Sequence, residues 1–115
     1  MSAASIRTAW EALLRSRIEP LLHSVLAGDD APPALRFKAE GCAETGLALA
    51  LLDRGELAVL LDAIYRDVGG KTIAERFGYP AQECIDVVSG RVTLPFLMPR
   101  APVYPSGRGG GGASG

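Results

Sequence analysis

Apolar residues recur at three- and four-residue spacing over most of residues 1–90, and this spacing predicts a series of amphipathic helices. The first is expected over residues 5–26 and the second over residues 33–52. Pro20 interrupts the first, and we expect a kink or a new helix start there because proline lacks a backbone N–H. A third helix is expected over residues 53–68, where Asp53 and Glu56 have the spacing of a capping box.

The second predicted helix is rich in small residues, and two of them are glycines in its interior. Glycine inside a helix costs roughly 1 kcal/mol relative to alanine, so Gly41 and Gly46 need a reason to be there. We expect another helix to approach closely at both positions, either from the same chain or from a second copy of it.

Two shorter helices are expected next. Thr72 and Glu75 form a second capping pattern, and the helix that they begin ends at Gly78. Pro80 suits the first turn of a last helix, which we expect to end at Gly90. The pattern therefore predicts an all-α fold, a small bundle of four to five helices over residues 1–90.

The chain changes character after residue 90. Residues 91–105 contain four prolines among many apolar side chains, so they cannot form a regular helix and are expected to lie as an extended segment on the bundle. Residues 106–115 are rich in glycine, which is typical of a flexible tail.

The stretch from Ile73 to Arg91, IAERFGYPAQECIDVVSGR, resembles the helix-turn-helix of bacterial repressors. Ala74, Gly78 and the apolar positions fit that pattern, and Ser-Gly-Arg stands where such units often end in Asn-Gly-Arg. The resemblance implies a first helix from Thr72, a turn at Gly78 and a reading helix from about Ala81 that lies in the major groove of DNA.

On this interpretation Gln82 lies near the base edges together with Arg91, while Lys71 and Arg76 contact phosphates. The expected reading helix also carries Glu83 and Asp86, however, and the formal net charge of the chain is −1. Proteins that bind nucleic acid usually have a basic excess or a basic face. A helix-turn-helix regulator that binds DNA is therefore the alternative interpretation rather than the preferred one.

The sequence shows no pattern of residues that is typical of catalysis or of a metal site. The chain has a single histidine, His23, and two cysteines, Cys42 and Cys84, which lie in apolar segments and are expected to be free buried thiols. We therefore expect no enzyme activity, no cofactor and no metal. The first residues lack the apolar core of a signal peptide, and no apolar run approaches the ~20 residues of a membrane span, which favours a cytoplasmic protein.

The remaining signals favour contact with another protein. The first predicted helix has a broad apolar face, and its candidate partner-binding residues are Trp10, Leu14, Ile18 and Leu21. A chain of 115 residues is one small domain, and small domains bury a small fraction of their surface, so we expect a homodimer. The expected function is that of a small non-enzymatic regulator that acts by protein contact, for instance by occluding a surface of a transcription factor.

Overall fold

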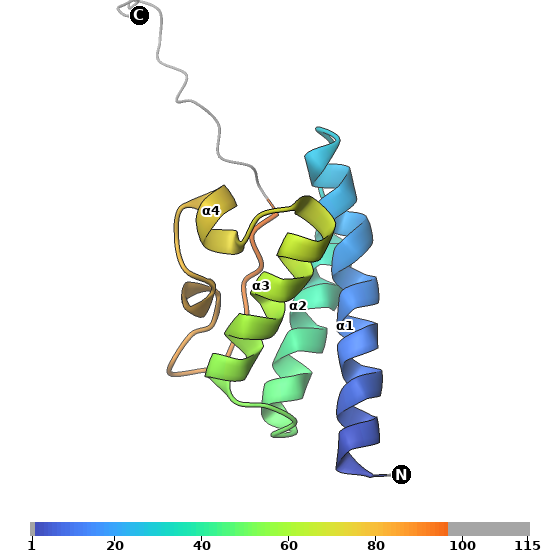
Figure 1. The fold of residues 1–115 in the computed structure, drawn as a ribbon, viewed down its shortest axis with the longest axis vertical. Helices are drawn as coiled ribbons and strands as arrows, with labels where there is room; N and C mark the ends of the chain where they lie inside the picture. Colours follow the sequence, from blue (N-terminus) through green and yellow to red (C-terminus); the bar gives the residue numbers. More distant parts are fainter. Residues whose placement is uncertain (1, 97–115) are drawn as a thin grey trace, which may run out of the picture.

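The computed structural model describes residues 2–96, in which helices α1 (Ala3–Leu26), α2 (Pro33–Ala48), α3 (Arg54–Gly69) and α4 (Ile73–Phe77) precede a 3-10 turn, η1 (Ala81–Cys84) (Figure 1). The long helices α1, α2 and α3 contact one another pairwise, and both α4 and η1 pack on α3. The all-α class predicted from the hydrophobic spacing is confirmed for these residues.

The predicted capping boxes set the starts of α3 and α4. The Asp53 carboxylate accepts the N–H of Glu56 at 2.7 Å, and the Glu56 carboxylate accepts the N–H of Asp53 at 2.9 Å. Thr72 and Glu75 exchange the same two bonds at 3.2 and 2.8 Å. Pro20 does not divide the first helix, because α1 continues through it to Leu26.

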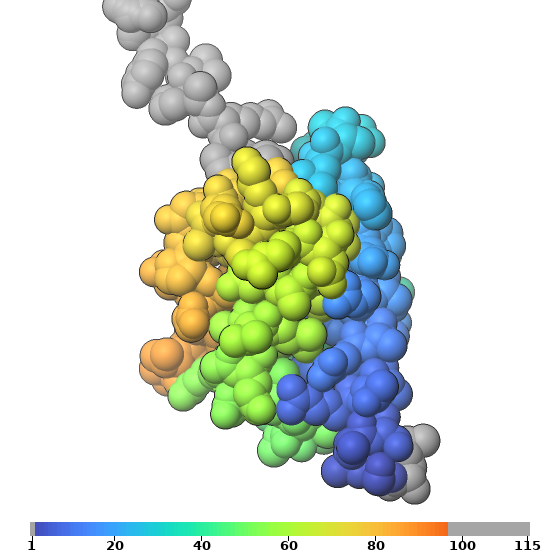
Figure 2. All heavy atoms as spheres, viewed as in Figure 1, coloured from blue at the N-terminus to red at the C-terminus, as the bar shows by residue number. Residues whose placement is uncertain are grey.

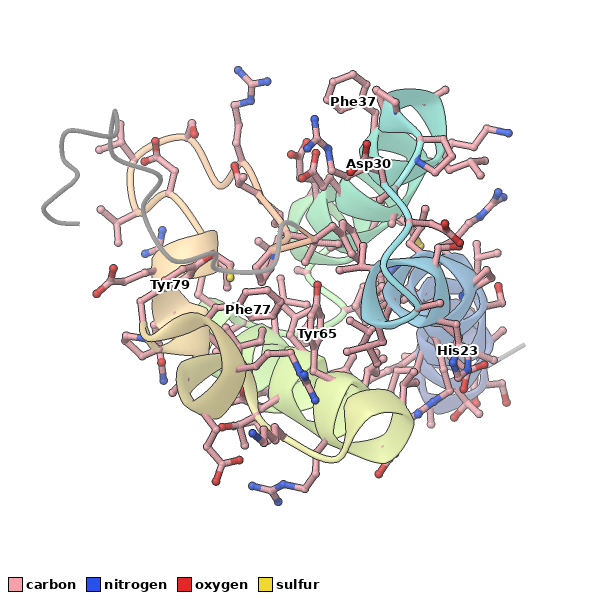
Figure 3. All side chains as sticks on the ribbon, turned by 90° about the horizontal axis from the view of Figure 1, so that it is seen from above. His23, Asp30, Phe37, Tyr65, Phe77 and Tyr79 are labelled. Atoms are coloured by element: carbon pink, nitrogen blue, oxygen red, sulfur yellow. The ribbon has the colours of Figure 1, made fainter. Side chains whose placement is uncertain are left out.

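Tyr65 of α3 occupies the middle of the interior (Figure 3). Its ring meets Phe77 edge-on at 6.0 Å between centroids and stacks on Phe96 at 6.2 Å. Its hydroxyl donates a hydrogen bond to the Pro95 carbonyl at 3.0 Å, and burial raises its pKa well above the usual value. Tyr65 thereby ties α4 and the end of the described chain to α3.

The two glycines of α2 lie in different surroundings. A β-carbon at Gly46 would overlap the indole of Trp10, with Cε2 and Cη2 at 2.5 and 2.7 Å, so the expected close approach is confirmed there and involves α1. The indole N–H also donates to the Cys42 carbonyl at 2.8 Å. At Gly41, in contrast, a β-carbon would meet nothing within 4 Å among residues 2–96, so no helix of the same chain approaches closely there, and the approach of a second copy stays a prediction.

The last predicted helix, over residues 80–90, is not what the structure contains. Helical geometry ends with the single 3-10 turn η1, and the chain then forms a hairpin, residues 84–93, in which Ile85 pairs with Val92 in antiparallel fashion. The N–H of Thr93 donates to the Cys84 carbonyl at 2.8 Å, and the N–H of Asp86 donates to the Arg91 carbonyl at 2.9 Å. The expectation of a helix to Gly90 is therefore wrong.

Local chemistry explains this hairpin. The Asp86 carboxylate accepts the N–H groups of Val88 and Ser89 at 2.7 and 3.3 Å, and these bonds lower its pKa. Such a bond from an aspartate to the backbone two residues ahead builds a turn and competes with a helix. The paired residues Ile85 and Val92 are β-branched, which favours extended backbone as well.

The end of the described chain returns along the bundle as an extended segment between α2 and α3 (Figure 1). Val92, Leu94, Pro95 and Phe96 are buried, whereas Arg91 and Thr93 are exposed. The first part of the expected extended segment thus lies on its own domain, while residues 97–105 and the glycine-rich residues 106–115 fall outside the described residues.

Candidate protein-binding groove

A groove of about 860 Å³ lies between α2 and the 84–93 hairpin. Helix α2 contributes Arg36, Phe37, Glu40, Gly41 and Glu44 to one wall. These positions are three or four residues apart along the helix or adjacent, so they share one face. The opposite wall is formed by the end of η1 and by the hairpin.

The charged groups of the groove do not cancel. Glu40, Glu44, Glu83 and Asp86 line it together with two guanidiniums, those of Arg36 and Arg91, which gives a formal balance of −2. Within residues 2–96 none of these six groups belongs to an ion pair. A concave surface with walls of low dielectric concentrates such a field, so the groove attracts positive charge.

Glu40 and Glu44 accept main-chain hydrogen bonds from the extended segment, as a neighbouring strand would. One Glu44 oxygen accepts the N–H of Val92 at 2.9 Å, and Glu40 Oε2 accepts the N–H of Leu94 at 2.8 Å. Alternate residues of an extended chain point their N–H groups the same way, and side chains one helical turn apart match that repeat. The two carboxylates therefore hold the segment in place by main-chain bonds.

Glu40 is a charged side chain with only 9% of its surface exposed. Its Oε2 accepts the N–H of Leu94, and its Oε1 is not among the buried side-chain atoms of residues 2–96 that lack a hydrogen-bond partner. Burying a charge is costly unless it is paired. The main-chain bond to Leu94 therefore satisfies the side of this carboxylate that faces the extended segment.

Arg36 does not neutralise Glu40. Its guanidinium carbon lies 5.3 Å from the centroid of the Phe37 ring, and its Nε is buried without a hydrogen-bond partner in the described part of the chain. The Phe37 side chain is 61% exposed and projects outward from α2, in contrast with Tyr65 in the interior (Figure 3). The rim of the groove therefore presents an aromatic ring to solvent.

Gly41 lies on the α2 wall beside Glu40. Gly41 is exposed, and a β-carbon on it would meet no atom within 4 Å, so close packing does not explain why a residue that costs a helix about 1 kcal/mol occupies this position. The missing side chain instead leaves space inside the groove. This makes Gly41 a candidate functional residue rather than a structural one.

The hairpin tip next to the groove exposes two valines. Val87 and Val88 are 72% and 91% exposed, and Figure 2 shows the tip in orange at the edge of the molecule beside the start of α3. Arg54 of α3 donates from Nη1 to the Val87 carbonyl at 2.6 Å, and the turn at Asp86 fixes the other side. The valines are thus held outward by a supported turn.

The structure places the partner-binding residues expected on the first helix inside the molecule. Trp10, Leu14, Ile18 and Leu21 are between 0 and 7% exposed, and all four belong to the core cluster. Because α2 and α3 cover the broad apolar face of α1, that face is not available to a partner. This corrects the expectation, and the expected homodimer stays a prediction.

The four residues of the DNA-binding alternative lie on different elements. Lys71 is exposed between α3 and α4, Gln82 is exposed on η1, and Arg91 lies on the groove wall. Arg76 of α4 donates from Nη2 to the Gly69 carbonyl. The segment that the resemblance assigns to a reading helix is a 3-10 turn in the structure, so no helix presents these residues together.

Sequence reasoning missed the α2 wall because its carboxylates looked like scattered residues of a polar face. A signal was present, since Phe37, Glu40, Gly41 and Glu44 follow the spacing of one helix face and combine an aromatic ring, two acids and a glycine. Their common surface only becomes visible when the hairpin is placed opposite them.

Comparisons with known proteins give no function for the groove. No family model matches the chain, and no curated protein or solved structure is significantly similar to it. In the part of the chain that the structure describes, no cluster of histidine, cysteine and acidic residues has the arrangement of a metal site. Over the same residues, no helix has the length and apolar character needed to cross a membrane.

Proposed function

We propose that the protein is a small non-enzymatic regulator that acts by binding another protein, and that the groove and the Val87–Val88 tip form its contact surface. The groove itself is the observation that carries this proposal. It combines exposed apolar side chains at its rims with charged groups along its walls, which is the mixed composition of a protein interface.

The charge of the groove favours a basic partner surface. Surfaces that bind nucleic acid carry lysine and arginine to neutralise phosphates. A protein with an acidic groove and two fixed valines can cover such a surface and compete with the nucleic acid for it. Occlusion of the basic surface of a transcription factor is therefore the form of regulation that we propose.

A photo-crosslinking amino acid placed at Phe37 or at Val88, in cells of the native organism, tests this proposal. Ala12, which is exposed on α1, provides the control position. We expect the same partner to be crosslinked from both groove positions and not from Ala12. Equal adducts from all three positions, or no adduct from the groove positions, would contradict the proposal.

A purified partner allows a direct test of occlusion. If the crosslinked protein binds DNA, adding the full chain is expected to lower its DNA affinity, and a Val88→Glu variant is expected to do so less well. Val88 is 91% exposed, so this substitution leaves the core untouched. An unchanged DNA affinity in the presence of the wild-type protein would exclude occlusion as the form of regulation.

A further inference from the structure

We infer that the Val87–Val88 tip of one copy docks in a second groove, between α1 and α3, of another copy, and that this dimer covers the tip until the partner displaces the second copy. The inference rests on the proposed function, because the covered valines are those that we propose for the partner contact. It goes beyond that function by naming its regulation, which is self-association.

The second groove, called the α1–α3 groove below, has a volume of about 530 Å³ and lies at the start of α3. Apart from its charged residues, its lining is small or apolar and consists of Gly55, Val59, Leu60 and Ala63. The Val59 side chain is 69% exposed, and a β-carbon on Gly55 would meet only Asp53 Oδ1, at 3.4 Å. This groove therefore presents open apolar surface to solvent.

The tip is the apolar projection that suits such a groove. Val87 and Val88 are 72% and 91% exposed, and hydrogen bonds from Arg54 and to Asp86 hold the turn that carries them. Two β-branched side chains on a fixed turn lose little conformational freedom on binding. Since both valines and Val59 are exposed, the tip does not fill the α1–α3 groove of its own chain. A second copy supplies a tip that can.

The charge of the α1–α3 groove is negative. One arginine, Arg7, and three acids line it, which gives a formal balance of −2. Arg7 is shared between Glu11 and Glu56, at 2.9 and 3.5 Å, and Asp53 belongs to no ion pair among residues 2–96. The groove therefore favours a projection that carries positive charge at its sides.

The charge around the tip is positive. Arg54 donates to the Val87 carbonyl, and Arg91 ends the same turn that Asp86 begins, so two arginines and one acid give a formal balance of +1. Both arginines are exposed, and neither belongs to an ion pair within residues 2–96. Tip and groove are thus complementary in charge as well as in apolar character.

The position of the two surfaces allows a closed dimer. Arg54 holds the tip and the next residue, Gly55, lines the α1–α3 groove, so both surfaces lie at the start of α3, where Figure 2 shows the orange tip beside the green helix. In a two-fold dimer each contact occurs twice, with the roles of the two copies exchanged. A two-fold axis between tip and groove therefore places each tip at the groove of the other copy.

Sedimentation velocity of the full-length protein over a range of concentrations tests the inference. We expect a dimer of the wild type. Val88→Lys and Val59→Glu are each expected to weaken dimerisation by about tenfold or more, because each brings a charge into an apolar contact. Leu35→Glu, at a 46% exposed position of α2 outside both surfaces, is the control and is expected to dimerise like the wild type. Melting temperatures check that all three variants fold.

An equimolar mixture of Val88→Lys and Val59→Glu identifies the contact itself. In a mixed dimer one contact retains both native valines, and the other places the introduced lysine against the introduced glutamate. We therefore expect the mixture to dimerise at concentrations at which each variant alone is monomeric. A wild type that stays monomeric, or a mixture no more dimeric than its components, would overturn the inference.

Crosslinking separates this inference from the proposed function. Val59 lies outside the surface proposed for the partner, so Val59→Glu is expected to raise the crosslink yield from Phe37 by freeing the tip. An unchanged yield would overturn the regulatory role of the dimer. If the mixture dimerises as expected and no partner is crosslinked from any position, self-association is supported and the proposed function fails instead.

Discussion

Gly41 and Gly46 lie in the same helix, α2, but their surroundings are opposite. At Gly46 the indole of Trp10 occupies the place of a side chain, whereas at Gly41 no atom does so. Each glycine lowers helix stability by about 1 kcal/mol relative to alanine. Close packing of α1 offsets that cost at Gly46, and nothing in the described fold offsets it at Gly41.

The contrast extends to the two faces of α2. The face toward α1 has the small buried residues Ala39, Ala43 and Gly46, which allow the helices to approach. The face toward the hairpin has Glu40 and Glu44, whose carboxylates hold the extended segment and line an open groove. The packed face contributes to stability, and we attribute binding to the open one.

Among changes at the packed face, removal of the Trp10 indole is expected to lower the stability most. Trp10→Ala deletes a side chain that is 7% exposed together with its bond to Cys42, so it is expected to lower the free energy of unfolding by about 3–5 kcal/mol. Urea unfolding measures this loss. Leu13→Ala, at a position on the same helix that is 45% exposed, is the control and is expected to cost about 1 kcal/mol or less.

Alanine at each glycine tests the comparison itself. Gly46→Ala forces the indole aside and is expected to destabilise the fold by about 1–3 kcal/mol. Gly41→Ala meets no atom and is expected to stabilise the helix by up to about 1 kcal/mol. Thermal and urea unfolding of the pair measure the difference, and a change of the same sign in both variants would remove the basis of the comparison.

The open face has a structural contribution of its own at Glu40. Glu40→Leu leaves the N–H of Leu94 without an acceptor in a buried place and is expected to cost about 1–3 kcal/mol. Glu40→Gln retains an acceptor and is expected to cost less. Urea unfolding compares the two, and hydrogen exchange at the Leu94 amide is expected to quicken only in Glu40→Leu.

The smallest effect on the free energy of unfolding is expected at alkaline pH, from a buried thiol on the hairpin side of the groove. Burial, followed by the charges of Asp62 and Glu83, raises the pKa of Cys84 from 9.0 to about 11. Because the folded state favours the protonated thiol, the raised pKa of Cys84 contributes to the free energy of unfolding. This contribution is complete below pH 9.0 and is lost as the pH rises toward about 11.

Urea unfolding at a series of pH values checks this dependence. The stability of the wild type is expected to decline above pH 9.0. The decline in Cys84→Ala, measured relative to the stability of that variant at pH 7, is expected to be shallower. The pKa of the buried Tyr65 hydroxyl is also raised, so part of the decline in stability remains in the variant. Identical slopes in the two proteins would show that Cys84 does not titrate in this way.

Local patterns predicted much of the helical framework, because caps and periodic apolar residues act within a few positions. The starts at Asp53 and Thr72 are of this kind. The same periodicity could not tell whether the apolar face of α1 is covered by its own chain or by another, and this is why Trp10 and Leu14 were expected at a contact surface. Their burial is decided by α2 and α3.

The hairpin and the groove depend on more distant partners. Ile85 and Val92 suit extended pairing, but the spacing of apolar residues before them also suited a short helix, and the turn at Asp86 decides between the two. Glu40 and Glu44 find their partners 54 and 48 positions further along the chain. No local pattern contains that information, so the sequence did not predict the groove.

The most direct test of the central claim separates folding from binding in a single variant. Gly41→Leu is measured for its melting temperature and for the yield of crosslinks from a photo-crosslinking residue at Val88, with Ala12→Leu as the matched background. We predict a Gly41→Leu protein at least as stable as the wild type whose crosslink to the partner is lost, because the groove is filled while the fold is intact. A stable Gly41→Leu protein with the wild-type crosslink yield would contradict the assignment of the open face of α2 to binding.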